Sequence, residues 1–263
     1  MVNRTGTPIW YELISPDVEK GAAFYAGVLN WEVSSPQGGL DRDYRIASTG
    51  GTGVAGLMQA EGATAPRHWF VYFGAADVDE TARRAQEAGA AIHVPPTDIP
   101  GVGRFAFLAD PEGAMFYVMR GASEEDSRAF LAMASPEAQV PQGHAVWNEL
   151  TASDPAAAVH FYGSVLGIRQ EGAMPMGPLG DYAFLHSGPD AIGAVMPVLE
   201  GGEPGWLVYF AVDDIDAAVA RVRDAGGTIL AGPDEIPGGA FSVVAADDQA
   251  IRFGLVGPRR ARP

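Results

Sequence analysis

The pentapeptide IWYEL at Ile9–Leu13 decides how the sequence is organised, because it returns as VWNEL at Val146–Leu150, displaced by 137 residues. The stretch WFVYF at Trp69–Phe73 returns as WLVYF at Trp206–Phe210 with the same displacement. A register held over so much of a chain indicates an internal repeat. Shorter matches are Phe24–Tyr25 with Phe161–Tyr162, Ala109–Asp110 with Ala246–Asp247 and, displaced by 138 residues, Asp43–Tyr44 with Asp181–Tyr182.

The repeat divides the 263-residue chain into two similar domains. We place the first domain at 1–121 and the second at 144–258, with a linker at 122–143 and a basic tail at 259–263. The linker opens with polar and acidic residues, which is typical of a connection between domains. Within it we expect a short helix through Phe130.

Each domain carries the pattern of two βαβββ units, which predicts an α+β fold. The first unit opens with an apolar strand at 8–14, and Ser15-Pro16-Asp17 predicts an N-cap followed by proline at the first helical position. In the second unit Asp77-x-x-Glu80 resembles a capping box. Further strands are predicted near 69–74, 91–94, 104–109 and 114–120, and the helices of the second domain begin near Asp154–Pro155 and Asp213–Asp216.

Composition excludes several classes of function. The formal net charge is −16, with 33 acidic against 17 basic residues, so the surface repels polyanions and we expect no nucleic-acid partner. The chain has no cysteine, which excludes disulfides and thiolate metal ligands. No run of about 18 apolar residues occurs, so we expect no membrane partner. The polar N-terminus predicts a cytoplasmic protein.

Three motifs, taken in order and repeated, resemble a known family. They are the W-x-E-L strand at Trp10–Leu13, the F-Y-x-x-V-L helix end at Phe24–Leu29 and the V-D-D-I-D helix start at Val212–Asp216. The chain resembles the vicinal oxygen chelate superfamily of glyoxalases, bleomycin-resistance proteins and extradiol dioxygenases, in particular the tandem two-domain type of high-GC bacteria. The resemblance implies that paired βαβββ units form a curled mixed sheet around a cavity, with helices outside.

Enzymes of this family hold one metal ion on the cavity wall with His or Glu ligands from the first and last strands of each βαβββ unit. The matching positions of this chain carry residues that are poor ligands for a divalent metal. A register slip of two residues brings in His68, which still leaves the ligand set incomplete. We therefore expect no metal and no other cofactor. The matching residues are Trp10, Gly56, Phe70 and Tyr117, then Trp147, Ala194, Leu207 and Gly254.

Side chains alternate between the two faces of a strand, and the family's ligand positions indicate which set points into the cavity. This gives the residues expected to line the cavities. They are mostly aromatic, which is typical of a site for a small hydrophobic or aromatic organic molecule. Packing in an ordinary core is the alternative interpretation of the aromatic residues. The expected ligand-binding residues are Trp10, Phe70, Tyr72, Met115, Tyr117, Trp147, Tyr209 and Arg252.

Two glutamates lie in apolar strands, where a carboxylate is costly to bury unless it is hydrogen-bonded. Glu12 and Glu149 are therefore either tied to a loop backbone or exposed in a cavity. In the second case they are candidate catalytic acid–base residues, with His68 as a partner of Glu12. Tyr44, Tyr72 or Tyr117 is then a candidate hydrogen-bond donor to an oxyanion.

These observations favour a metal-independent member of the family that binds a small hydrophobic organic ligand, in antibiotic self-resistance or secondary-metabolite handling. The alternative is a metal-free tailoring enzyme, an isomerase, lyase or cofactor-free hydroxylase that uses a cavity glutamate. A metal-dependent glyoxalase or dioxygenase is disfavoured because its ligands are missing. Two fused domains favour a monomer, and a homodimer stays open.

Overall fold

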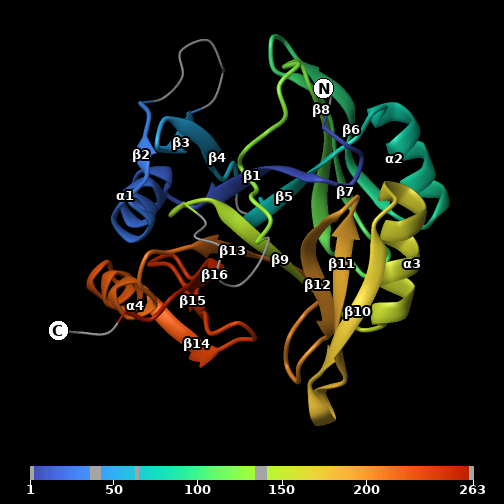
Figure 1. The fold of residues 1–263 in the computed structure, drawn as a ribbon. Coiled ribbons are helices and arrows are strands. Elements are labelled where there is room, and N and C mark those ends of the chain that lie inside the picture. The colour runs from blue at the N-terminus through green and yellow to red at the C-terminus, as the bar shows by residue number, and fades with distance from the viewer. Residues whose placement is uncertain (1–2, 36–42, 63–64, 134–140, 261–263) are drawn as a thin grey trace. The chain divides into compact units, whose positions relative to one another are not determined.

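Four βαβββ modules follow one another along the chain, as the repeat predicts (Figure 1). The computed structural model describes residues 3–35, 43–62, 65–133 and 141–260. Modules 1 and 2 form the first repeat, and modules 3 and 4 form the second.

The helices and strands of the first repeat have the following bounds. Module 1 contains β1 (Pro8–Ser15), α1 (Val18–Leu29), β2 (Glu32–Val33), β3 (Tyr44–Thr49) and β4 (Thr52–Gln59). Module 2 contains β5 (His68–Gly74), α2 (Val78–Glu87), β6 (Ala91–Ile99), β7 (Gly103–Ala109) and β8 (Met115–Gly121).

The second repeat has the same order of elements with one added 3-10 turn, η1. Module 3 contains β9 (Ala145–Ala152), α3 (Pro155–Leu166), β10 (Arg169–Pro175), η1 (Gly177–Leu179), β11 (Asp181–Ser187) and β12 (Asp190–Pro197). Module 4 contains β13 (Gly205–Ala211), α4 (Ile215–Asp224), β14 (Thr228–Glu235), β15 (Phe241–Ala246) and β16 (Arg252–Gly257).

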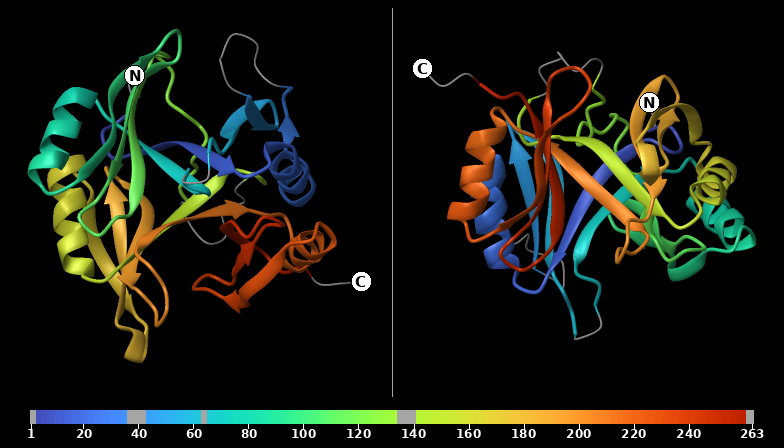
Figure 2. Two further views of the ribbon diagram at one scale, coloured as in Figure 1. Left: turned by 180° about the vertical axis from the view of Figure 1, so that it is seen from behind. Right: turned by 90° about the horizontal axis from the view of Figure 1, so that it is seen from below.

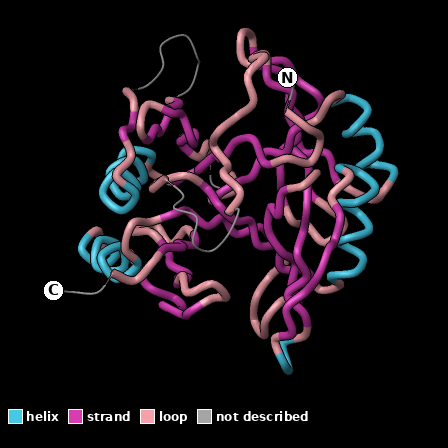
Figure 3. The backbone as a smooth tube through the Cα atoms, viewed as in Figure 1, coloured by secondary structure: helices cyan, strands magenta, loops and turns pink. Residues whose placement is uncertain are grey.

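Each repeat forms one eight-stranded mixed sheet, with the order β2-β3-β4-β1-β5-β8-β7-β6 in the first and β10-β11-β12-β9-β13-β16-β15-β14 in the second. In every module the first and last strands pair in parallel, as β1 does with β4 and β13 with β16. The pairs β2–β3, β3–β4, β6–β7 and β7–β8 are antiparallel, and so are their counterparts in the second repeat. Figure 3 shows the strands in magenta and the helices in cyan. A parallel pair needs a crossover connection, and the helix of each module lies in it. The predicted α+β fold is confirmed.

An aspartate caps the N-terminus of each of the four α-helices in the described chain: Asp17, Asp77, Asp154 and Asp214. The prediction for the first helix was wrong by two residues. Ser15 belongs to β1 and its hydroxyl donates to the Asp17 carbonyl, while the Asp17 side chain accepts the Lys20 backbone N–H. Proline at the first helical position occurs in α3 instead.

By internal contacts the chain divides into two compact units, and each combines one module from either repeat. Unit 1 holds most of modules 2 and 3, in Phe70–Ser127 and Trp147–Trp206. Unit 2 holds most of modules 1 and 4, in Trp10–Trp69 and Leu207–Pro263. Helix α2 packs against α3 in unit 1, and α1 packs against α4 in unit 2 (Figures 1 and 2). The domain boundaries set from the repeat stay a prediction.

A buried tyrosine joins the two repeats inside unit 2. The Tyr25 hydroxyl donates to Asp247 at 3.2 Å and accepts the indole N–H of Trp69 at 2.8 Å. Burial raises the pKa of Asp247, although backbone N–H groups and Tyr25 oppose the shift. Burial, followed by the charge of Asp247, also raises the pKa of Tyr25, so its hydroxyl keeps its proton.

Unit 1 repeats this arrangement with the roles of the repeats exchanged. Tyr162, from the second repeat, donates to Asp110 of the first at 3.0 Å and accepts the indole N–H of Trp206 at 2.9 Å. Burial raises the pKa of Asp110 as well. Each unit therefore contains a buried hydrogen bond from a tyrosine hydroxyl of one repeat to an aspartate carboxylate of the other.

The described part of the linker forms no helix, so the predicted helix there was wrong. Phe130 instead makes a parallel bridge to Ala145. The backbone N–H of Leu131 donates to the Ala145 carbonyl at 3.0 Å. Among the described residues, no helix is both long and apolar enough to cross a membrane.

Candidate ligand-binding site

Three side chains of module 1 form the Trp–Tyr–Glu cluster of that module, and all three lie in unit 2. Trp10 and Glu12 alternate along β1 and so point to the same sheet face. The Tyr44 hydroxyl, from β3, accepts the Trp10 indole N–H at 3.1 Å and donates to Glu12. Glu12 is only 5% exposed, and this hydrogen bond offsets part of the cost of burying it.

The electrostatics of the cluster fix where its proton lies. Burial, and then the charge of Glu12, raise the pKa of Tyr44 well above its ordinary value. The tyrosine proton is directed at Glu12, so the geometry does not support Tyr44 as a donor to an oxyanion. Glu12 is held by a side chain from β3, two strands away in the sheet, an arrangement that the sequence did not predict.

Module 3 repeats the Trp–Tyr–Glu cluster in unit 1. The indole N–H of Trp147 donates to the Tyr182 hydroxyl at 2.8 Å, and that hydroxyl donates to Glu149 at 2.8 Å. All three residues are half-buried, whereas Glu12 in module 1 is buried. The second cluster is therefore the more accessible of the two.

Each tyrosine reaches its Trp and Glu partners across one intervening strand. The residue of that strand beneath the tyrosine is small. In module 1 that strand is β4, where a Cβ added to Gly56 would lie 1.9 Å from the Tyr44 hydroxyl oxygen. In module 3 the matching residue on β12 is Ala194, which is paired with Glu149 on one side and Phe184 on the other. The tyrosine thus takes the space that a longer side chain at position 56 would need.

These residues do not fit the metal site that the resemblance implies. Position 56 cannot carry a ligand side chain unless Tyr44 moves. Across the described ranges, no three or more His, Asp or Glu side chains gather in a group that could hold a metal ion. A divalent metal needs several converging N or O donors.

Module 2 carries a row of stacked rings in unit 1. Tyr72, Tyr117 and Phe107 are neighbours across β5, β8 and β7. The Tyr72 and Tyr117 ring centroids lie 4.1 Å apart with 3° between the planes, and those of Tyr117 and Phe107 lie 4.3 Å apart with 19°. Rings stacked on one another present their positive edges, which suit the face of a further aromatic ring.

Phe70 shows this edge-to-face geometry within the same unit. Its ring meets Tyr117 at 86° and Phe107 at 86°, with centroids 5.8 Å and 5.4 Å away. Met115 is half-buried at the start of β8. The structure thus brings Phe70, Tyr72 and Tyr117 together. Phe107 was not predicted, although its register with Tyr117 follows once β7 and β8 are paired.

Module 4, in unit 2, lacks the row of rings. Its Tyr209 is paired with Gly254, and a Cβ added to Gly254 would lie 2.2 Å from the Tyr209 ring. Arg252 is exposed at the start of β16, in register with Ala246. His68, the predicted partner of Glu12, is half-buried at the start of β5. The ligand-binding and catalytic roles of these residues stay predictions.

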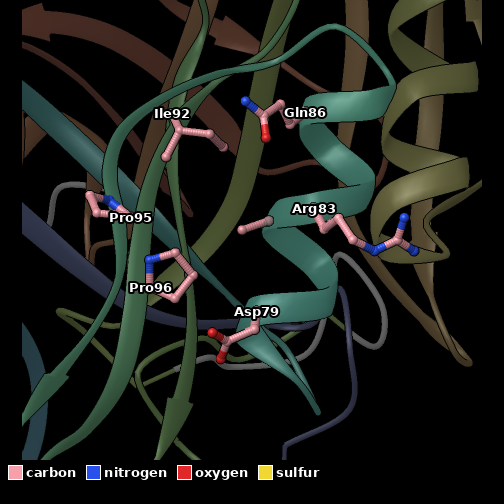
Figure 4. A pocket seen from close by; sticks show the side chains of 7 residues that line it. Asp79, Arg83, Gln86, Ile92, Pro95 and Pro96 are labelled. Atoms are coloured by element: carbon pink, nitrogen blue, oxygen red, sulfur yellow. The ribbon is translucent and has the colours of Figure 1, made fainter.

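A separate pocket of about 350 Å³ lies between α2 and β6 (Figure 4). Its charged side chains already form ion pairs, since Asp79 binds Arg104 at 2.7 Å and Arg83 binds Glu80 at 2.7 Å. It contains none of the predicted site residues. The lining residues are Asp79, Ala82, Arg83, Gln86, Ile92, Pro95 and Pro96.

Tyr182 is a further residue of the site that the sequence analysis did not predict. Its signal was present, because Asp43–Tyr44 and Asp181–Tyr182 match across the repeat while the loops around them differ. The contact could not be predicted without the strand order, since β11 is separated from β9 by β12.

A family model described as the Glyoxalase/Bleomycin resistance protein/Dioxygenase superfamily matches this chain twice, over residues 7–118 and 142–254. The anthracycline biosynthesis protein DauV of Streptomyces sp. (strain C5) is 31% identical over 98% of this chain and 95% of its own length. The putative glyoxylase CFP32 of Mycobacterium tuberculosis is 41% identical over 48% of each chain.

The fold is also similar to that of solved structures. The Mn(II)-bound glyoxalase from Novosphingobium aromaticivorans superposes with a TM-score of 0.63 over 98% of this chain and 83% of that chain, at 20% identity. This likeness concerns the fold alone.

Proposed function

Since this chain belongs to the Glyoxalase/Bleomycin resistance protein/Dioxygenase superfamily, we propose that it binds a small aromatic molecule of secondary metabolism without a metal ion. One observation carries the proposal: the tyrosine of each Trp–Tyr–Glu cluster crosses the strand position where the family places a metal ligand. The cluster replaces a metal-binding surface with aromatic rings around one carboxylate.

The stacked rings of module 2 support an aromatic ligand. Tyr72, Tyr117 and Phe107 present a row of ring edges, and such edges interact favourably with the face of a flat ring system. The relative DauV is described as an anthracycline biosynthesis protein. Anthracyclines as a chemical class contain fused aromatic rings. An anthracycline is therefore the first probe to test.

The test is a fluorescence titration of the full chain with an anthracycline, with and without a chelator of divalent metals. We expect saturable binding with the same Kd in both conditions. The control adds Mn²⁺ or Zn²⁺ back, which should leave the Kd unchanged. Binding that is lost with the chelator and restored by stoichiometric metal would overturn the proposal.

A second candidate function, metal-free acid–base catalysis, is favoured by one observation: a tyrosine holds a glutamate at the same place in both repeats. The variants Glu12→Gln and Glu149→Gln distinguish the two functions. A binding protein should keep its Kd for an uncharged aromatic ligand within a few-fold in both variants. An enzyme should bind its substrate and lose turnover in at least one of them.

A further inference from the structure

Module 3 differs from module 1 beside its Trp–Tyr–Glu cluster. Phe184 stands two residues after Tyr182, where module 1 has Ile46 two residues after Tyr44. The Phe184 ring lies 6.2 Å from the Trp147 ring at 76°, and 6.2 Å from the Tyr182 ring at 81°. Phe184 thus adds a third ring to the module 3 cluster, at a steep angle to each of the other two.

The carboxylate of Glu149 belongs to the same face of the sheet. Glu149 and Phe184 are both paired with Ala194, one on each side of β12. Residues paired across neighbouring strands point to the same face. Four side chains from β9 and β11 therefore gather around one small residue: Trp147, Glu149, Tyr182 and Phe184.

Solvent reaches all four of these side chains, because each is half-buried. In module 1 the glutamate is buried, and an aliphatic side chain, Ile46, replaces the third ring. The arrangement of three accessible rings with an accessible carboxylate is thus specific to module 3.

The chemistry of these groups selects for a cation. The faces of aromatic rings attract positive charge, most strongly in tryptophan, and cages of several rings recognise organic ammonium groups. A carboxylate adds a full negative charge, and the hydrogen bond from Tyr182 fixes the carboxylate of Glu149 beside the rings. The two hydrogen bonds of the cluster hold the Trp147 and Tyr182 side chains in place before a ligand arrives, which lowers the entropic cost of binding.

We propose that Trp147, Glu149, Tyr182 and Phe184 bind the ammonium group of an organic amine. This inference rests on the proposed function in one respect, that the amine belongs to the aromatic ligand. The first repeat, with Ile46 and a buried Glu12, does not bind the amine.

The first experiment compares an anthracycline that carries a primary amine on its sugar with its N-acetyl derivative, which has the same rings without the charge. We expect the full chain to bind the amine about 10-fold more tightly, in line with a cation–π contact next to a carboxylate. Phe184→Ile, which copies the first repeat, should reduce this preference several-fold. Glu149→Gln should reduce it further while it keeps an acceptor for Tyr182.

The matched control is Ile46→Phe, which changes the first repeat toward the second and should leave the preference unchanged. Equal binding of amine and N-acetyl derivative overturns the amine site and leaves the proposed function standing. Failure of the full chain to bind either compound overturns the proposed function.

A second experiment tests the amine site without the aromatic ligand. Choline is titrated into the full chain, in parallel with its neutral carbon isostere, and the Trp147 indole N–H signal is followed by NMR, assigned with Trp147→Phe. We expect choline alone to shift this signal, and the shift should weaken in Glu149→Gln. No shift with choline, or an equal shift with both compounds, overturns the inference.

Discussion

At two positions of the sheets, a glycine leaves the space that a neighbouring tyrosine side chain occupies. Gly56 has no side chain, and the Tyr44 hydroxyl uses the space above it to reach Trp10 and Glu12. Gly254 does the same for the ring of Tyr209. At these places the residue that decides the structure is the one without a side chain.

Gly56→Ala is expected to destabilise the protein by about 1–3 kcal/mol, because the new methyl group overlaps the Tyr44 hydroxyl and forces the cluster apart. Urea unfolding measures the loss.

Gly121→Ala is the matched control in the same sheet. A Cβ there meets nothing within 4 Å, so the free energy of unfolding should change by less than about 0.5 kcal/mol. If Tyr44 is first replaced by leucine, Gly56→Ala should cost less than in the wild type. Equal costs in the two backgrounds would mean that Tyr44 does not fill this space.

The two buried aspartates predict a pH dependence of stability. Burial raises the pKa of Asp247 above its ordinary value of 3.8, so the folded state binds this proton more tightly than the unfolded state. The contribution of Asp247 to the free energy of unfolding is therefore greatest below its pKa in the unfolded state. It falls as the pH rises through its pKa in the folded state. The free energy of unfolding of wild type minus that of Asp247→Asn should decrease as pH rises from about 4.

Asp110→Asn should behave in the same way, because burial raises the pKa of Asp110 too. Asp79→Asn gives the opposite sign, since the hydrogen bond from Arg104 lowers the pKa of Asp79. A wild-type curve parallel to that of Asp247→Asn across this range would show that Asp247 titrates normally.

At the scale of elements, the sequence predicts most of what the structure contains. Asp77, Asp154 and Asp214 start their helices as expected, because an aspartate before an apolar helical pattern supplies a local acceptor for the first backbone N–H groups. The prediction failed at Ser15, where two possible caps follow each other, and at Phe130, where a contact distant in sequence forms the bridge to Ala145. Local signals predict elements, whereas side-chain contacts across an intervening strand, such as that of Tyr182 with Glu149, need the strand order.

Helix α1 contains an exposed glycine that offers a test of its packing. A Cβ added to Gly27 meets nothing within 4 Å, so Gly27→Ala should stabilise the protein by about 0.5–1 kcal/mol through helix propensity alone. In α3, a Cβ at Gly163 would lie 3.2 Å from the Ile168 carbonyl oxygen, so Gly163→Ala should gain less. Thermal unfolding monitored by circular dichroism compares the two, and a larger gain for Gly163→Ala would contradict the packing described for these helices.

At the scale of the whole molecule, the repeat seen in the sequence and the compact units seen in the structure divide the chain differently. Each repeat supplies one module to unit 1 and one to unit 2. The sequence could not predict this division, because the repeat shows which segments are alike and does not show which of them pack together.

The two buried tyrosines should act independently, since Tyr25 and Tyr162 share no hydrogen-bond partner and belong to different units. Tyr25→Phe and Tyr162→Phe each leave a buried carboxylate and an indole N–H with one bond fewer, at an expected cost of about 1–3 kcal/mol. The double variant should lose the sum of the two within about 0.5 kcal/mol. Urea unfolding of the four proteins tests additivity, and an interaction energy above about 1 kcal/mol would show that the two sites are coupled.

Because each compact unit draws on both halves of the sequence, a single cut between the repeats would not separate one unit from the other. The two fragments would each supply half of both units, held by the Tyr25–Asp247 bond in one and the Tyr162–Asp110 bond in the other. A nicked protein would thus persist as an assembly of two polypeptides, and the covalent connection serves to keep the halves at high effective concentration.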